Sequence, residues 1–169
     1  MDIIKASTDW ARAEVFSSQF FIFFAILFLI GSFGFRQLGK TEVAKAFVTP
    51  MLIAGILLLA VGVGILIANK ARVTAFAEAY NNNTAGFIKS ELARTAKSMG
   101  EYRLIVFKII PLMIAVAALL IIFMDKPIWR ASSITAMAML MVILLVDNNA
   151  NARIEAYHQK LVSVDKNLN

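Results

Sequence analysis

Residues 20–30 read FFIFFAILFLI, so ten of eleven consecutive side chains are Phe, Ile or Leu. They belong to the first of four apolar blocks, which cover residues 15–35, 51–68, 104–123 and 131–146. A helix of about 20 mostly apolar residues crosses the ~30 Å hydrocarbon core of a bilayer. The chain is 60% apolar and 17% charged, whereas soluble domains are about 45–50% apolar and about 25% charged. The sequence therefore predicts an all-α integral membrane protein, a bundle of four transmembrane helices.

Short polar turns divide the four blocks into two helical hairpins. The first hairpin, residues 1–84, has spans at about 15–35 and 47–68 and turns at residues 39–41. The second hairpin, residues 85–169, has spans at about 104–124 and 129–146 and turns at residues 125–127. Because residues 36–40 read RQLGK and three more spans follow, we expect the first block to be a span and not a signal peptide.

On the side away from these turns, the helical pattern continues but becomes polar. Residues 69–80 and 147–160 contain neither Gly nor Pro, which predicts helices that run unbroken for at least two turns beyond the hydrocarbon. Residues 81–84 read NNNT, which indicates a turn in which Thr84 caps the next helix. Beyond Lys160 we expect a frayed polar tail.

The two halves of the chain resemble each other, which predicts duplication of a hairpin, with chance similarity between apolar helices as the alternative. Residues 70–73 (KARV) follow the second span as residues 151–154 (NARI) follow the fourth, and both exits then reach Glu-Ala-Tyr. Eleven Lys and Arg residues lie beside the termini and the central segment, against five near the turns. We expect a cell membrane, as in a bacterial inner membrane, and this asymmetry favours a cytoplasmic location for both termini.

Depth along the helices points to one polar cluster. Counted from the turn at residues 126–127, Lys108 and Asp147 lie at nearly the same height, because each residue adds 1.5 Å. The cluster predicted at this depth is Gln19, Lys108, Asp147, Asn148, Asn149 and Asn151. Ionisable groups in spans face the bundle interior and mark ion or substrate paths, so we expect Lys108 and Asp147 to approach within salt-bridge or one-water reach. The alternative is that Lys108 extends to the interface and Asp147 is the first aqueous residue of its helix.

Opposite charges at matching heights predict ion pairs at the helix ends. Glu14 lies level with Lys70 and Arg72, and Glu101 lies level with Arg153. Glu155 and His158 form a Glu-x-x-His motif of the kind found in di-metal bundles, but the second histidine is missing. The chain has no cysteine and one histidine, so we expect no metal and no other cofactor.

The remaining features concern contacts and shape. Gly55, Gly62 and Gly64 lie along the second span, where small residues permit close helix association. Pro111 is expected to kink the third span. The net charge of +6 indicates contact with anionic lipids at the helix ends and not nucleic-acid binding.

Three functions fit these patterns. The preferred one is a non-catalytic subunit or scaffold, either a homo-oligomer or a complex with another membrane protein, assembled through the glycine face and the polar extensions. The alternatives are an oligomeric channel or transporter that uses the cluster around Lys108 and Asp147, and a lipid-active enzyme with Asp147, Arg153 and Glu155 at the headgroup boundary. An enzyme is the less favoured because the sequence shows no nucleophile–base pair, phosphate loop or metal set.

Overall fold

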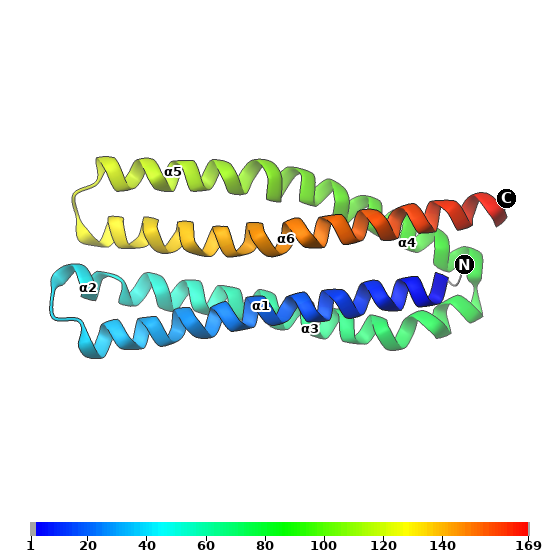
Figure 1. The fold of residues 1–169 in the computed structure, drawn as a ribbon, viewed down its shortest axis with the longest axis horizontal. Helices are drawn as coiled ribbons and strands as arrows, with labels where there is room; N and C mark the ends of the chain where they lie inside the picture. The colour runs from blue at the N-terminus through cyan, green and yellow to red at the C-terminus, as the bar shows by residue number, and fades with distance from the viewer. Residues whose placement is uncertain (1–2, 169) are drawn as a thin grey trace.

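The computed structural model describes residues 3–168, which are almost entirely helical and include no strand. The elements in chain order are α1 (Ile3–Leu38), α2 (Glu42–Ala46), α3 (Val48–Asn82), α4 (Thr84–Glu101), the π-helix η1 (Tyr102–Ile109), α5 (Ile110–Phe123) and α6 (Pro127–Leu168). They line up as four long rods, α1, α2–α3, α4–η1–α5 and α6, that lie side by side in two hairpins (Figure 1).

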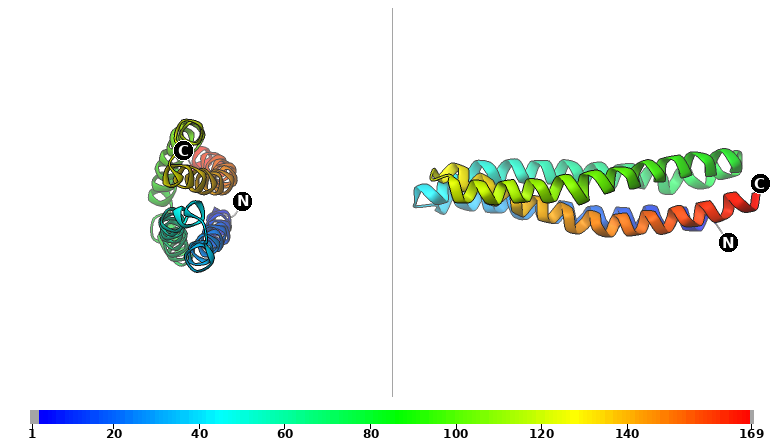
Figure 2. Two further views of the ribbon diagram at one scale, coloured as in Figure 1. Left: turned by 90° about the vertical axis from the view of Figure 1, so that its left-hand side faces the viewer. Right: turned by 90° about the horizontal axis from the view of Figure 1, so that it is seen from above.

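All four rods are long and apolar enough to cross a membrane. The shortest, α1, has 36 residues and is therefore about 54 Å long, whereas a hydrocarbon core is ~30 Å thick. Each rod thus combines an apolar part with a polar part. We call residues 15–68 and 104–146 the apolar half, and residues 3–14, 69–103 and 147–168 the polar half. Both chain ends and the α3–α4 connection lie at the polar end of the molecule (Figures 1 and 2).

The turns of the apolar half lie where the sequence places them. Helix α1 ends at Leu38, and the Thr41 hydroxyl accepts a hydrogen bond from the Ala44 amide at 3.1 Å to cap α2. Pro127 is the first residue of α6, where its missing N–H costs no helical hydrogen bond.

The connection in the polar half is tighter than expected. Helix α3 runs to Asn82, so Asn83 is the one non-helical residue between α3 and α4. Its side-chain oxygen accepts a hydrogen bond from the Gly86 amide at 2.8 Å. The prediction that Thr84 is the cap is therefore wrong. Thr84 is already helical, and its hydroxyl donates back to the Tyr80 carbonyl at 3.1 Å.

The polar helical extensions are confirmed, because α3 and α6 continue unbroken to Asn82 and Leu168. The prediction that α6 frays beyond Lys160 is wrong. Leu161 is fully buried in the core of the polar half, and Val164 packs against that core. This burial gives the last turns of α6 a tertiary reason to stay helical, which propensity alone does not supply.

Each half has its own core. In the apolar half the core consists of Phe21, Ala25, Phe28, Ala54, Leu58 and Val142. In the polar half it consists of Ile3, Trp10, Ala11, Phe76, Phe87, Ile88, Ile154, Tyr157 and Leu161. The second core draws on α1, α3, α4 and α6, so the polar half closes as a four-helix bundle (Figure 2).

The predicted glycine face lies inside the first hairpin. A Cβ on Gly62 would lie 2.9 Å from the Phe21 Cβ, and one on Gly55 would lie 2.8 Å from the Leu29 side chain. Gly64 has nothing within 4 Å. The glycines at 55 and 62 therefore close α1 onto α3 of the same chain, and the expectation that they form an assembly contact is wrong.

Pro111 follows the π-helix η1 instead of interrupting an α-helix. A proline ring clashes with the carbonyl four residues earlier and has no N–H to donate. The π-helical turns of η1 lead directly into the segment that contains this proline. There the Ile110 amide bonds to the Ile105 carbonyl, five residues back. A π-helical turn takes up more residues than an α-helical one. Side chains on η1 therefore point in directions that an α-helical count does not predict.

Candidate functional site

A stripe of polar and aromatic side chains on α1 faces the interior of the polar half. Ser7, Trp10, Glu14 and Ser17 are all buried. Their spacing of three and four residues places them on one face of a helix. Where an amphipathic helix usually buries aliphatic residues, α1 buries hydrogen-bonding groups, so the neighbouring helices must supply partners.

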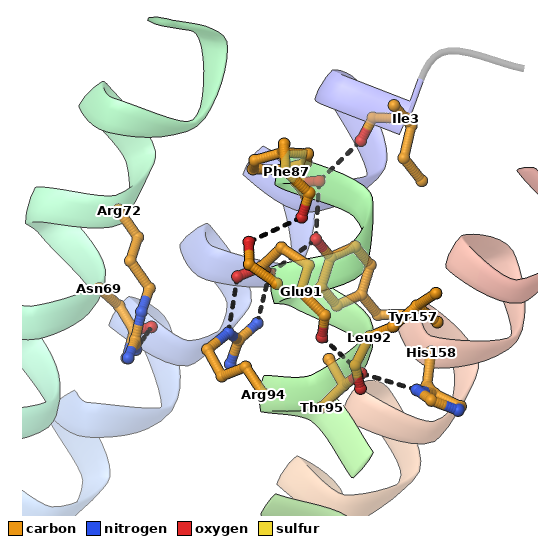
Figure 3. A network of polar contacts seen from close by, with 12 residues as sticks. Ile3, Asn69, Arg72, Phe87, Glu91, Leu92, Arg94, Thr95, Tyr157 and His158 are labelled. Carbon is orange, nitrogen blue, oxygen red and sulfur yellow. Dashed lines mark hydrogen bonds and ion pairs between the residues drawn. The ribbon is translucent and has the colours of Figure 1, made fainter. Parts of the chain in front are cut away.

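The partners on α4 and α6 form a connected network (Figure 3). Both carboxylate oxygens of Glu91 accept hydrogen bonds from the Arg94 guanidinium, at 2.8 and 2.6 Å. The Tyr157 hydroxyl lies 2.9 Å from Glu91 Oε2 and 2.8 Å from the Ser7 oxygen. A phenol has one proton, and a carboxylate is the stronger acceptor. We therefore assign the Tyr157 proton to Glu91, which leaves the Ser7 hydroxyl free to donate to Ile3 O at 2.8 Å or to Tyr157.

Aromatic contacts hold this network in place. The Trp10 ring stacks on the Tyr157 ring with centroids 5.5 Å apart, and the Arg94 guanidinium lies 4.3 Å from the Trp10 ring centroid. A cation over an indole face is attracted by the negative face of the ring. The Trp10 Nε1–H is buried and makes no hydrogen bond in the described part of the chain.

Burial also affects protonation in the network. Removal from water raises the pKa of the Tyr157 phenol above its usual range, so this hydroxyl retains the proton that it donates.

One helical turn along α4, Thr95 Oγ1 lies 2.6 Å from His158 Nδ1 and bonds to the Glu91 carbonyl at 2.8 Å. If Thr95 donates to that carbonyl, His158 Nδ1 is the donor to Thr95.

A second network joins the two hairpins. The Arg153 guanidinium on α6 donates to Glu14 Oε1 on α1 at 3.0 and 3.1 Å, and to the Ser17 hydroxyl oxygen at 2.8 Å. Glu14 is buried, and Arg153 is partly exposed. Because this ion pair is largely shielded from water, loss of either partner would leave the other charge without a counter-charge in a poorly hydrated site.

Between the two networks lies a partly open cavity of about 190 Å³. Each rod contributes one charged side chain to its wall: Glu14 from α1, Arg72 from α3, Arg94 from α4 and Asp147 from α6. Ser98 and Tyr102 add hydroxyl groups. Towards the apolar half the cavity ends at Phe21, Ile65 and Val146, which are part of or pack against the apolar core.

Of the polar cluster predicted from depth, Gln19 and Asn149 line a common groove between α1 and α6, whereas Asp147 lines the cavity. The predicted ion pair between Lys108 and Asp147 is not formed. Lys108 is exposed on η1, whose π-helical turns change its direction, whereas Asp147 lines the cavity. Gln19, Asn148 and Asn149 are exposed, Asn151 is partly buried, and the Asn149 amide donates to the Leu145 carbonyl at 3.0 Å.

The predicted ion-pair residues combine differently from the expectation. Glu14 pairs with Arg153 across the hairpins and not with Lys70 or Arg72. Arg72 donates to the Asn69 side-chain oxygen at 2.8 Å, and Lys70 is exposed. Glu101 lies 3.8 Å from Lys97 on its own rod instead of pairing with Arg153. The observed partners therefore differ from those that matching heights along the helices predicted.

The Glu-x-x-His motif is not completed. Glu155 is exposed, and His158 contacts Thr95. Within residues 3–168 no group of three or more His, Cys, Asp or Glu side chains is placed to hold a metal ion.

A groove of about 890 Å³ lies between α1 and α6, in the apolar half and next to the inter-hairpin ion pair. Its walls are mostly apolar: Phe16, Phe20, Phe23, Phe24, Val142, Leu145 and Val146. Its polar end is formed by Ser17, Gln19, Asn149 and Arg153. The groove is therefore amphipathic along its length.

The sequence patterns did not single out Trp10, Glu91, Arg94 or Tyr157. A signal was available on α1, where residues 7, 10, 14 and 17 follow the three-and-four spacing of a buried helix face. No comparable rule links Glu91 to Tyr157, which are 66 residues apart.

The fold and the buried network define an all-α protein with four rods long and apolar enough to span a membrane, closed at one end by a polar bundle. No protein-family model, curated protein or solved structure matches this chain.

Proposed function

We propose that this chain is a multi-pass membrane protein whose apolar half lies in the bilayer and whose polar half projects into water. The apolar surface supports this placement: large side chains such as Ile30, Leu112, Ile122 and Leu145 are 62–69% exposed. A bilayer removes such surface from water, whereas in water it would be a large aggregation-prone patch. The excess of Lys and Arg around the polar half favours a cytoplasmic location for both termini, as expected for a bacterial inner membrane protein.

We further propose that the protein is a non-catalytic subunit of a membrane assembly and binds a transmembrane helix of another subunit. The observation that carries this proposal is the groove of about 890 Å³ between α1 and α6. On α1 it extends from Phe16 to Phe24, which is about 12 Å or two helical turns. This length suits the ridge of side chains that one helix inserts between two others.

The polar end of the groove also favours a helix as the occupant. Gln19 and Asn149 are exposed there, beside Arg153. Side-chain amides near membrane depth hydrogen-bond across helix interfaces, where water is scarce. A partner helix that fits this groove has apolar side chains along the phenylalanine wall. At the end of the groove near Gln19 and Asn149 it has polar side chains.

The alternatives receive less support from the geometry. A channel needs a polar path, but the cavity near Asp147 ends at Phe21, Ile65 and Val146. An enzyme needs a nucleophile, base or metal set, and the residues that line the groove supply none of these sets.

The absence of cysteine allows a clean test by single-cysteine cross-linking in membranes. Leu145 lines the groove and is 67% exposed, while Leu112 is 64% exposed on α5 and serves as a matched control. We expect L145C to form a disulfide-linked dimer if the partner is a second copy. A photo-reactive residue at 145 should capture a different subunit if the partner is another protein.

The control position decides the outcome. L112C and a photo-reactive residue at 112 should give little cross-linking to protein. If position 145 yields only lipid adducts, or no more protein adducts than position 112, the groove is filled by the bilayer and the proposal is wrong.

A further inference from the structure

The cavity in the polar half contains charges that the described residues do not fully compensate. Of the four charged residues in its wall, Arg94 donates hydrogen bonds to both carboxylate oxygens of Glu91, and Glu14 accepts hydrogen bonds from Arg153. Arg72 donates to the neutral Asn69 side chain and lies 5.9 Å from the Trp10 ring centroid. Asp147 makes no hydrogen bond or ion pair within residues 3–168. One cation and one carboxylate therefore face the same cavity without a direct partner of opposite charge.

These two charges lie on opposite hairpins, Arg72 on α3 and Asp147 on α6. A partly buried charge costs free energy unless hydrogen bonds or an opposite charge offset the loss of water. Arg72 and Asp147 form no ion pair with each other in this structure, so only water or a molecule that enters the cavity can offset their charges. That molecule needs an anionic group for Arg72 and a cationic group for Asp147.

The volume limits the size of the molecule. A protein cavity of about 150 Å³ accepts benzene, and this cavity is about 190 Å³, so a ligand of roughly six to eight non-hydrogen atoms fits. Tyr102 in the wall offers aromatic surface, to which an ammonium group is attracted. A guanidinium binds a carboxylate through two parallel hydrogen bonds.

We propose that this cavity binds a small zwitterion of amino-acid size, with its carboxylate at Arg72 and its ammonium group at Asp147. The ligand enters from the polar side, because Phe21, Ile65 and Val146 close the cavity towards the apolar half. A bound ligand bridges α3 to α6 and thereby links the two hairpins, beside the Glu14–Arg153 pair. This inference does not depend on the groove between α1 and α6.

Binding is measured by calorimetry on the full chain in nanodiscs, with alanine as the zwitterion and with propionate and propylamine as single-charge analogues. We expect a dissociation constant for alanine in the millimolar range or below. Each analogue should bind at least about tenfold more weakly, because it lacks the group that pairs with one of the two charged residues. R72Q and D147N should each weaken alanine binding about tenfold or more. The charge-matched controls R103Q and D9N, at exposed positions, should not change it.

A variant that keeps every charge distinguishes loss of the binding site from loss of the fold. S98L places a larger side chain in the cavity wall and should abolish alanine binding while circular dichroism remains helical. Failure of alanine to bind, or binding that R72Q and D147N leave unchanged, would overturn the proposal in favour of a water-filled cavity. Propionate binding as tightly as alanine, with D147N improving it, would instead identify an anion site and would also overturn it.

Discussion

The phenol oxygen of Tyr157 lies 2.9 Å from Oε2 of Glu91, and this hydrogen bond joins α6 to α4 inside the polar half. The two residues are 66 positions apart, and both are buried. The bond joins the two rods of the second hairpin, while the stacked Trp10 ring connects the same tyrosine to α1 of the first hairpin. Three rods therefore meet at one side chain.

Loss of this hydroxyl should destabilise the polar half. Y157F keeps the ring that stacks on Trp10 but leaves one Glu91 oxygen with fewer donors. A hydrogen bond to a charged group contributes about 1.5–3 kcal/mol, so we expect a loss of about that size in the free energy of unfolding, measured by denaturant titration in mixed micelles. Y80F is the control, since Tyr80 contacts the Phe87 ring and its change should cost little. Equal effects of the two variants would contradict the assigned bond.

The Glu14–Arg153 pair should show coupling in a double-mutant cycle. R153M leaves the Glu14 carboxylate buried without its cation and should cost about 2–4 kcal/mol of unfolding free energy. This lies below the range for a fully buried pair because the Arg153 side chain is 28% exposed. Adding E14Q should recover part of that loss.

The exposed Lys97–Glu101 pair is the comparison for this cycle. Its side chains are 80% and 56% exposed, so its coupling should be within about 0–1 kcal/mol. If both cycles give the same coupling, the Glu14–Arg153 pair does not hold the hairpins together.

Two neighbouring glycines on α3 should respond in opposite directions to the same substitution. G62A places a Cβ 2.9 Å from Phe21 and Ile22 side-chain atoms and 3.1 Å from the Ile22 amide, so α1 must move away. We expect a loss of about 1–3 kcal/mol from overpacking. G64A meets nothing within 4 Å and should be neutral or stabilising by up to about 1 kcal/mol, because alanine favours a helix over glycine. Unfolding titrations of both variants test this, and equal losses would mean that Gly62 does not mark the helix contact.

The Asn83 cap should stabilise the tight connection between α3 and α4. N83A removes the acceptor for the Gly86 amide and should cost about 1 kcal/mol. Hydrogen exchange at the first turn of α4 should quicken in this variant. N81A changes an exposed helical position and should leave that exchange unaltered; if it has the same effect, the cap is not responsible.

Much of the architecture followed from local features of the sequence. The four long apolar rods, the two turns of the apolar half and the unbroken extensions of α3 and α6 could all be predicted. Each depends on composition and spacing within a single segment: apolar length, Gly or Pro at a turn, and a run free of both. Distance along an α-helical segment was also readable, because every residue of an α-helix adds about 1.5 Å.

Direction around each helix was decided by tertiary packing. Glu14 and Arg153 were each expected to pair within their own hairpin, but the structure pairs them with each other across the hairpins. Lys108 was expected to contact Asp147, yet it lies on the π-helical turns of η1 and is exposed. An error of one residue changes height by about 1.5 Å but turns a side chain by about 100°, since 3.6 residues make a full turn. The sequence therefore determined the rods and their levels, whereas only their mutual packing brought one charged residue from each rod to a common cavity.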